Sequence, residues 1–177
     1  AAQAMTNILE NLNGMAAIGV GVGLMTIVGQ CMGADRKDEA VYYIKKLSVI
    51  AEVAIIVSCL LVFALIRPVT VLGGMEPASA KMCFHMVTWI TLVKPIVWTL
   101  AFVPAYGLRA AGDVKFSMIT SCLVMWLCRF CLCVILIRFL GFGPMGVWIG
   151  MFADWTVRAV IFTWRFHSRR WLRYKVI

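Results

Sequence analysis

The chain has 177 residues, of which 63% are hydrophobic and 14% are charged, and its mean hydropathy is +0.92. A soluble core of this size cannot bury so much apolar surface, so the composition excludes an ordinary soluble domain and predicts an integral membrane protein. The net charge of +9 does not indicate a nucleic-acid partner, because the basic residues lie between apolar runs without the interleaved aromatics of a base-stacking surface.

Five apolar segments are long enough to cross a bilayer as helices at about 1.5 Å per residue. We expect them at residues 12–32, 48–66, 82–108, 116–137 and 145–164, with a turn-rich connection at 67–77. The sequence therefore predicts an all-α protein, a polytopic transmembrane bundle of about five helices that forms a single domain over residues 1–177.

The first segment carries two kinds of pattern. Glycines four residues apart predict close approach of a neighbouring helix; they are Gly19 with Gly23 and Gly29 with Gly33. Polar and small residues at helical spacing mark one face, which either lines a water-filled cavity or packs against another part of the protein; they are Asn7, Glu10, Asn11, Gly14 and Gln30.

The third segment contains Pro95 and Pro104, so we expect a kinked helix. Trp98, Phe102 and Tyr106 follow one another at four-residue spacing, and this stripe either packs or forms a wall for an organic cation. The fourth segment contains a CxxCxC motif, but no His or acidic residue stands at ligand spacing, so no metal site is expected.

Basic residues predict the orientation. The connections after the first and third segments, together with a basic tail at 165–177, hold eleven Lys and Arg, whereas the opposite side holds three. The positive-inside rule therefore places the tail and Arg109 in the cytoplasm and the start of the chain outside. Because the chain opens at Ala1 in a polar helical pattern without a signal peptide, we expect it to be part of a longer protein.

Five residues of the types Lys, Arg, Asp and Glu lie within the apolar segments; they are Glu52, Lys94, Arg129, Asp154 and Arg158. A charge at mid-membrane costs at least roughly 2.5 kcal/mol, so each should face water or the protein interior and have a partner. Equal depth predicts that Glu52 pairs with Lys94 and that Arg129 pairs with Asp154. Arg158, one turn from Asp154, can share that carboxylate. Such pairs either fix helix register or exchange partners with a cation or proton during transport.

Four blocks of sequence resemble, in order and spacing, the multidrug and toxic compound extrusion (MATE) family. They are VGQCMGADRKDEA at 28–40, GLRAAGDVK at 107–115, WLCR at 126–129 and GPMGVWIGMFADWTVRA at 143–159. The resemblance covers nearly the whole chain. It implies a protein of two six-helix bundles, with this chain as the second bundle lacking its first helix and the N-terminal bundle as its missing partner.

The resemblance also implies a function. Family members export organic, often cationic compounds in exchange for Na⁺ or H⁺ by alternating access, so we expect a non-enzymatic antiporter of the inner cell membrane without a cofactor. One branch uses an acidic residue for coupling about eleven positions before the arginine of an LRGxxD-like motif. Residues 95–99 hold no carboxylate here, so Glu10 or the missing half would supply it. The cavity candidates are Glu10, Asn11, Gln30, Trp98 and Tyr106.

Other functions remain open. A lipid-linked precursor flippase of the same superfamily is the nearest alternative, because its basic groove would use Lys94, Arg129 and Arg158. A membrane-embedded enzyme is disfavoured, because His85 and His167 lie near opposite faces without acid–base partners beside them. A non-transporting structural subunit would be expected to lack buried charge.

Overall fold

The computed structural model describes residues 2–72, 74, 76–139, 141 and 143–173, and these residues form helices and connections without a strand. The helices are α1 (Ala2–Gly33), α2 (Lys37–Leu72), α3 (Pro77–Ala110), α4 (Val114–Val124), the π-helix η1 (Met125–Leu132), α5 (Cys133–Arg138), α6 (Pro144–His167) and the 3₁₀ turn η2 (Arg170–Arg173). Since α4, η1 and α5 form one continuous span, the described residues contain five helices long and apolar enough to cross a membrane. The predicted all-α, five-span bundle is confirmed.

The helices are longer than the apolar segments that predicted them. α1 already begins at Ala2, ten residues before the expected start, and α2 continues through Pro68 to Leu72. The expected connection at 67–77 is thus reduced to residues between Leu72 and Pro77. Hydropathy marks the part of a helix that suits hydrocarbon, whereas the backbone hydrogen bonding continues beyond it. As a consequence, Glu10 lies well inside a spanning helix.

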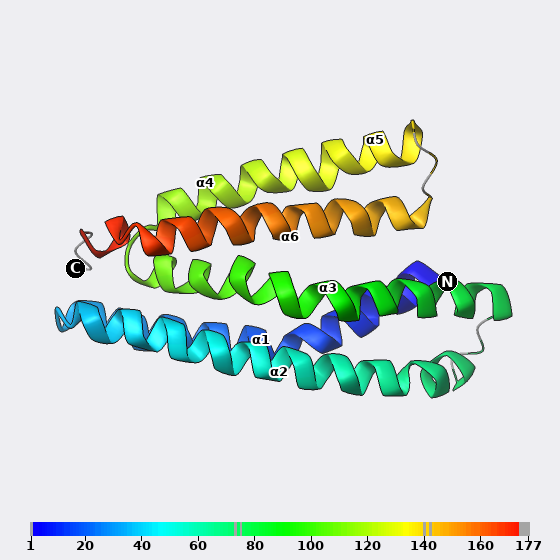
Figure 1. The fold of residues 1–177 in the computed structure, drawn as a ribbon, viewed down its shortest axis with the longest axis horizontal. Helices are drawn as coiled ribbons and strands as arrows, with labels where there is room; N and C mark the ends of the chain where they lie inside the picture. The colour runs from blue at the N-terminus through cyan, green and yellow to red at the C-terminus, as the bar shows by residue number, and fades with distance from the viewer. Residues whose placement is uncertain (1, 73, 75, 140, 142, 174–177) are drawn as a thin grey trace.

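α3 is the central helix of the bundle. It packs against α1 and α2 on one side and α6 on the other, and α6 in turn packs against α4, η1 and α5 (Figure 1). The connections after α1 and α3 lie at one end of the bundle with the C-terminal end of α6, and those after α2 and α5 lie at the other end (Figure 1). The chain therefore crosses back and forth as expected, while the side of the membrane on which each end lies stays a prediction. Residues 174–177 of the expected basic tail lie outside the described residues.

The glycines that bring helices together are not the predicted pairs. An ideal Cβ would meet no described atom within 4 Å at any of the four, Gly19, Gly23, Gly29 and Gly33. Close approach occurs instead at Gly21, where a Cβ would lie 2.6 Å from the ring of Tyr106, and at Gly107, where it would lie 2.6 Å from Ile44 Cδ1. Spacing along α1 therefore identified small residues, but it did not identify the face of α1 that α3 covers.

Candidate functional site

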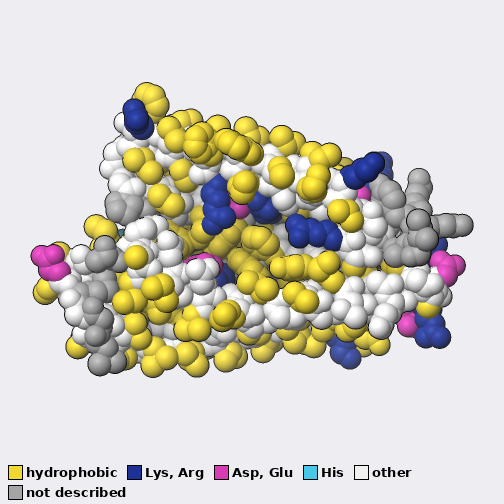
Figure 2. Space-filling model, turned by 180° about the vertical axis from the view of Figure 1, so that it is seen from behind, with side chains coloured by type: hydrophobic (Ala, Val, Ile, Leu, Met, Phe, Trp, Pro, Cys, Tyr) yellow, Lys and Arg dark blue, Asp and Glu magenta, His cyan; other side chains and the backbone are white. Residues whose placement is uncertain are grey.

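A cavity of about 220 Å³ lies between α1, α3, η1 and α6. Its lining residues come from all four helices; they are Glu10, Asn11, Gly14, Ile18, Trp98, Phe102, Tyr106, Arg129 and Trp155. Figure 2 shows basic and acidic side chains gathered near the middle of one hollowed face, surrounded by apolar side chains. Charge is thus concentrated at mid-height of the bundle, where an ordinary lipid-facing surface would have none.

Four of the five predicted cavity residues share this cavity: Glu10, Asn11, Trp98 and Tyr106. Gln30 does not. It lies farther along α1, in a separate hollow of about 380 Å³ that Cys31, Arg36 and Glu39 also line. The structure thus brings these four residues together, and their part in binding stays a prediction.

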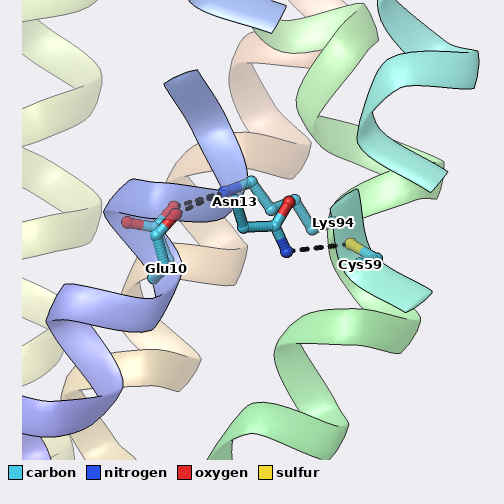
Figure 3. A network of polar contacts seen from close by, with 4 residues as sticks. All are labelled: Glu10, Asn13, Cys59 and Lys94. Carbon is cyan, nitrogen blue, oxygen red and sulfur yellow. Dashed lines mark hydrogen bonds and ion pairs between the residues drawn. The ribbon is translucent and has the colours of Figure 1, made fainter. Parts of the chain in front are cut away.

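The ion pair between Lys94 and Glu10 joins α3 to α1 beside the cavity (Figure 3). Lys94 Nζ lies 2.7 Å from Glu10 Oε1 and also donates to the Glu10 carbonyl oxygen at 3.0 Å. The Lys94 side chain is fully buried, at 0% exposure, while the Glu10 side chain is 17% exposed. The lysine is therefore shielded from the cavity, and the Glu10 carboxylate is the member of the pair that is accessible from it.

The predicted pair between Lys94 and Glu52 is wrong. Glu52 is partly buried on α2 and forms no ion pair with any described residue. The expected first span begins at residue 12, which places Glu10 before the hydrocarbon. Once α1 begins at Ala2, Glu10 lies within the bundle, and the packing of α1 on α3 brings it to Lys94.

Two further residues of α1, Asn13 and Gly14, lie close to this pair. Gly14 lies directly beside the ammonium, because a Cβ at this position would be in van der Waals contact with Lys94 Nζ, at 3.4 Å. Asn13 donates from Nδ2 to Cys59 Sγ of α2 at 3.0 Å (Figure 3), and its Oδ1 is buried without a hydrogen-bond partner among the described residues. One turn of α1 therefore holds polar contacts to both α2 and α3.

The aromatic stripe of α3 already contacts cations of the protein itself. Lys94 Nζ lies 5.7 Å from the centroid of the Trp98 ring, and Trp98 stacks on Phe102 at 4.8 Å. The Arg158 guanidinium lies 5.8 Å from the Phe102 ring, and the Arg109 guanidinium lies 5.9 Å from the Tyr106 ring. At these distances each ring attracts the cation beside it.

A second buried ion pair lies within α6. Arg158 Nε donates to Asp154 Oδ1 at 2.8 Å, which confirms the predicted one-turn contact, and Arg158 Nη2 donates to the Ser121 carbonyl at 3.0 Å. The Asp154 side chain is only 1% exposed. Its second oxygen, Oδ2, has no hydrogen-bond partner among the described residues.

The predicted pair between Arg129 and Asp154 is wrong. Arg129 is exposed, lines the cavity and forms no ion pair with any described residue. Residue 129 lies in η1, whose i to i+5 hydrogen bonding widens the turn, so its side chain points in another direction than it would in a regular α-helix. Asp154 instead forms an ion pair with Arg158 on its own helix.

Sequence reasoning missed a third ion pair, between Asp113 and Arg165. Arg165 Nε donates to Asp113 Oδ2 at 2.7 Å, and the two side chains are 12% and 2% exposed. The guanidinium also lies 4.5 Å from the centroid of the Phe116 ring. The available signal was topological: the connection after the third span and the end of the fifth span must lie at the same end of the bundle, so these opposite charges could meet.

Comparison with known proteins gives a consistent set of relatives. The MatE family model matches residues 1–135. A probable multidrug resistance protein NorM of Thermotoga maritima is 22% identical over 169 residues, covering 96% of this chain and 36% of that protein. The uncharacterized transporter YisQ of Bacillus subtilis is 39% identical over 67 residues, covering 38% of this chain and 15% of that protein.

A probable multidrug resistance protein NorM of Rhodopseudomonas palustris is 37% identical over 61 residues, covering 34% of this chain and 13% of that protein. The alignments thus span little more than a third of the Thermotoga protein, 36%, and smaller parts of the other two. No solved structure matches the chain.

Proposed function

This chain belongs to the MatE family, and from that membership we propose that it forms the carboxy-terminal part of a secondary active antiporter that exports organic compounds in exchange for Na⁺ or H⁺. Two of the relatives are named as multidrug resistance proteins, which supports export of organic compounds. The five apolar helices support a multi-pass membrane protein. We place it in the inner cell membrane with the basic tail in the cytoplasm, as the positive-inside rule predicts.

The observation that carries this proposal is the placement of the Glu10–Lys94 pair at the wall of a cavity inside a membrane bundle. A buried lysine has to keep a carboxylate partner, because an uncompensated charge in this environment is costly. Any event that neutralises Glu10 therefore strains the pair. Since Glu10 is partly exposed to the cavity, a proton or cation arriving there can compete with Lys94 for the carboxylate.

The proposed transport cycle uses this competition. Loading of H⁺ or Na⁺ at Glu10 weakens the bond between α1 and α3, and release of the ion restores it. Such a change alters the packing of two helices that line the substrate cavity, which is what alternating access requires. In this proposal the Asp154–Arg158 pair fixes the local structure of α6, because both charges lie on one helix and their contact need not change when helices move.

The proposed partners are the lipid bilayer, a small organic substrate and an N-terminal bundle of the same protein. The hollowed face in Figure 2 supports the last of these. Charged side chains lie in its centre, and the exposed Asn11 of α1 lines the cavity. A second bundle placed there would enclose the cavity, so the substrate would lie between the two bundles.

Transport in vesicles tests the proposal. The full-length transporter containing this chain is reconstituted, and the efflux of fluorescent organic compounds is followed under an imposed Na⁺ or H⁺ gradient. We expect efflux with one of the two gradients and none without a gradient. Glu10→Gln should abolish the gradient dependence. Absence of gradient-driven efflux for both anionic and cationic compounds would remove the antiporter assignment.

A second candidate function is a flippase for a lipid-linked precursor. The observation that favours it is the excess of basic residues around the cavity: among the described residues there, Lys94, Arg129 and Arg158 are opposed by two carboxylates, Glu10 and Asp154. The phosphate groups of such a lipid would suit a basic groove. Flipping of a fluorescent phospholipid in the same vesicles distinguishes this function from the export of soluble compounds.

A further inference from the structure

Arg129 differs from the other charged residues around the cavity because it has no acidic partner in the part of the chain that the structure describes. Lys94 is paired with Glu10, and Arg158 is paired with Asp154. Arg129 forms no ion pair with any described residue, and its exposed side chain lines the cavity. The wall of the cavity formed by this chain therefore carries one uncompensated positive charge.

The depth of Arg129 makes its isolation costly. It lies nine residues before Arg138, the last residue of the span Val114–Arg138, and thus in the interior of that span. A guanidinium at that depth is expected to face water or a partner rather than acyl chains. It lies in a π-helix, and such wide turns are frequent at functional sites.

The same cavity wall has few free groups that could bind an organic cation. Glu10 is the only carboxylate among the lining residues, and Lys94 already holds it at 2.7 Å. The rings of Trp98, Phe102 and Tyr106 already contact cations of the protein. An incoming cation would have to displace one of these groups and would also be repelled by Arg129.

The wall suits an anion with an apolar body. A guanidinium binds carboxylate and phosphate groups through two parallel hydrogen bonds. Apolar surface lies on both sides of Arg129: Trp155 and Ile18 line the same cavity, and Met125, Trp126 and Phe130 form with Arg129 an adjoining hollow of about 280 Å³. One ligand can therefore place its charge on Arg129 and its body on the neighbouring rings.

From these contacts we infer that Arg129 is the substrate-binding residue for an amphipathic organic anion, with a carboxylate or phosphate group at the guanidinium and an apolar body in the adjoining cavity. This inference rests on the proposed function and names its substrate class. It departs from the cationic compounds that the family resemblance implies.

Two dyes with the same xanthene ring system and opposite charge test the inference: fluorescein, an aromatic carboxylate, and rhodamine 6G, a cation. Gradient-driven efflux of each is measured with the full-length transporter in vesicles. We expect wild-type protein to export fluorescein at least tenfold faster than rhodamine 6G. Arg129→Gln should raise the KM for fluorescein tenfold or more, and Arg129→Lys should restore part of the affinity because it keeps the charge.

Arg138→Gln is the matched control, because Arg138 is exposed at the end of the same span and outside the cavity. Flipping of a fluorescent phosphatidic acid forms a second arm. Flipping that depends on Arg129, without export of fluorescein, would identify the bound anion as a lipid headgroup. Export of fluorescein without flipping would identify a soluble carboxylate.

Three results would overturn the inference and leave the antiporter assignment in place. The first is wild-type preference for rhodamine 6G, which is decisive even if Arg129→Gln does not fold. The second is an Arg129→Gln variant that exports fluorescein as well as wild type. The third is an equal loss of both dyes in Arg129→Gln and Arg129→Lys, which indicates a structural role. Absence of any driven transport would instead contradict the proposed function itself.

Discussion

Lys94 of α3 binds Glu10 of α1 at 2.7 Å across a sequence separation of 84 residues, and its side chain is completely buried. The ammonium lies beside Gly14, one turn along α1 from Glu10. In addition to their apolar packing, two helices that share a cavity wall are thus joined by an ion pair. Its strength therefore bears on both the stability and the movement of the bundle.

Removing the lysine should destabilise the protein strongly. Lys94→Met leaves Glu10 without its cation, and breaking a buried ion pair by removing one partner lowers the free energy of unfolding by about 3–5 kcal/mol. Thermal unfolding in detergent measures the effect. The double variant Glu10→Gln/Lys94→Met should be more stable than Lys94→Met, because no charge is left unpaired. Lys81→Met, at an exposed position of α3, is the control and should leave the unfolding temperature unchanged.

Gly150 should not tolerate alanine. A Cβ at this position would collide with Cys133 Sγ and would lie 3.1 Å from the Cys128 backbone carbonyl oxygen. We expect Gly150→Ala to lower the free energy of unfolding by about 1–3 kcal/mol, as overpacking does. Adding Cys133→Ala should recover only part of this loss, because the carbonyl remains. Gly23→Ala is the control, since a Cβ there meets nothing within 4 Å; equal losses in the two glycine variants would contradict the packing of η1 on α6.

The Asp113–Arg165 pair should stabilise the end of the bundle where α3, α4 and α6 meet. Arg165→Gln leaves a carboxylate that is 2% exposed without its guanidinium, so we expect a loss of about 3 kcal/mol in the free energy of unfolding. Arg165→Lys should lie between wild type and Arg165→Gln, because it keeps the charge but loses the planar group over Phe116. Arg170→Gln, an exposed neighbour, should have no measurable effect in the same unfolding assay.

The orientation in the membrane is open to direct labelling. In a variant whose seven cysteines are replaced, a single cysteine is introduced at exposed Lys37 or exposed Lys81, which lie near opposite ends of the bundle. The positive-inside rule predicts that Lys81→Cys reacts with a membrane-impermeant maleimide added outside the cell, and that Lys37→Cys reacts only after permeabilisation. The reverse pattern would turn the whole chain around and place the basic tail outside.

The number and order of the membrane helices followed from the sequence alone. An apolar stretch of about 20 residues suits the hydrocarbon core wherever it lies in a fold, so five stretches gave five spans. The family was equally readable: the MatE family model matches residues 1–135, which include the block at 107–115 on which the resemblance rests in part. The contact between Asp154 and Arg158 was predictable too, since one turn of a helix fixes it without reference to a second helix.

The partners across helices were decided only by the tertiary structure. Depth in the membrane gives one coordinate, the height along a helix, and it led to Glu52 as the partner of Lys94, whereas the structure pairs Lys94 with Glu10. Contact also requires that each helix be rotated toward the other and that the two be neighbours. The packing of α1 on α3 selects Glu10, and the wide turn of η1 directs Arg129 into the cavity. How each helix is rotated and which helices are neighbours depend on how all the helices pack together, and no local stretch of sequence determines that packing.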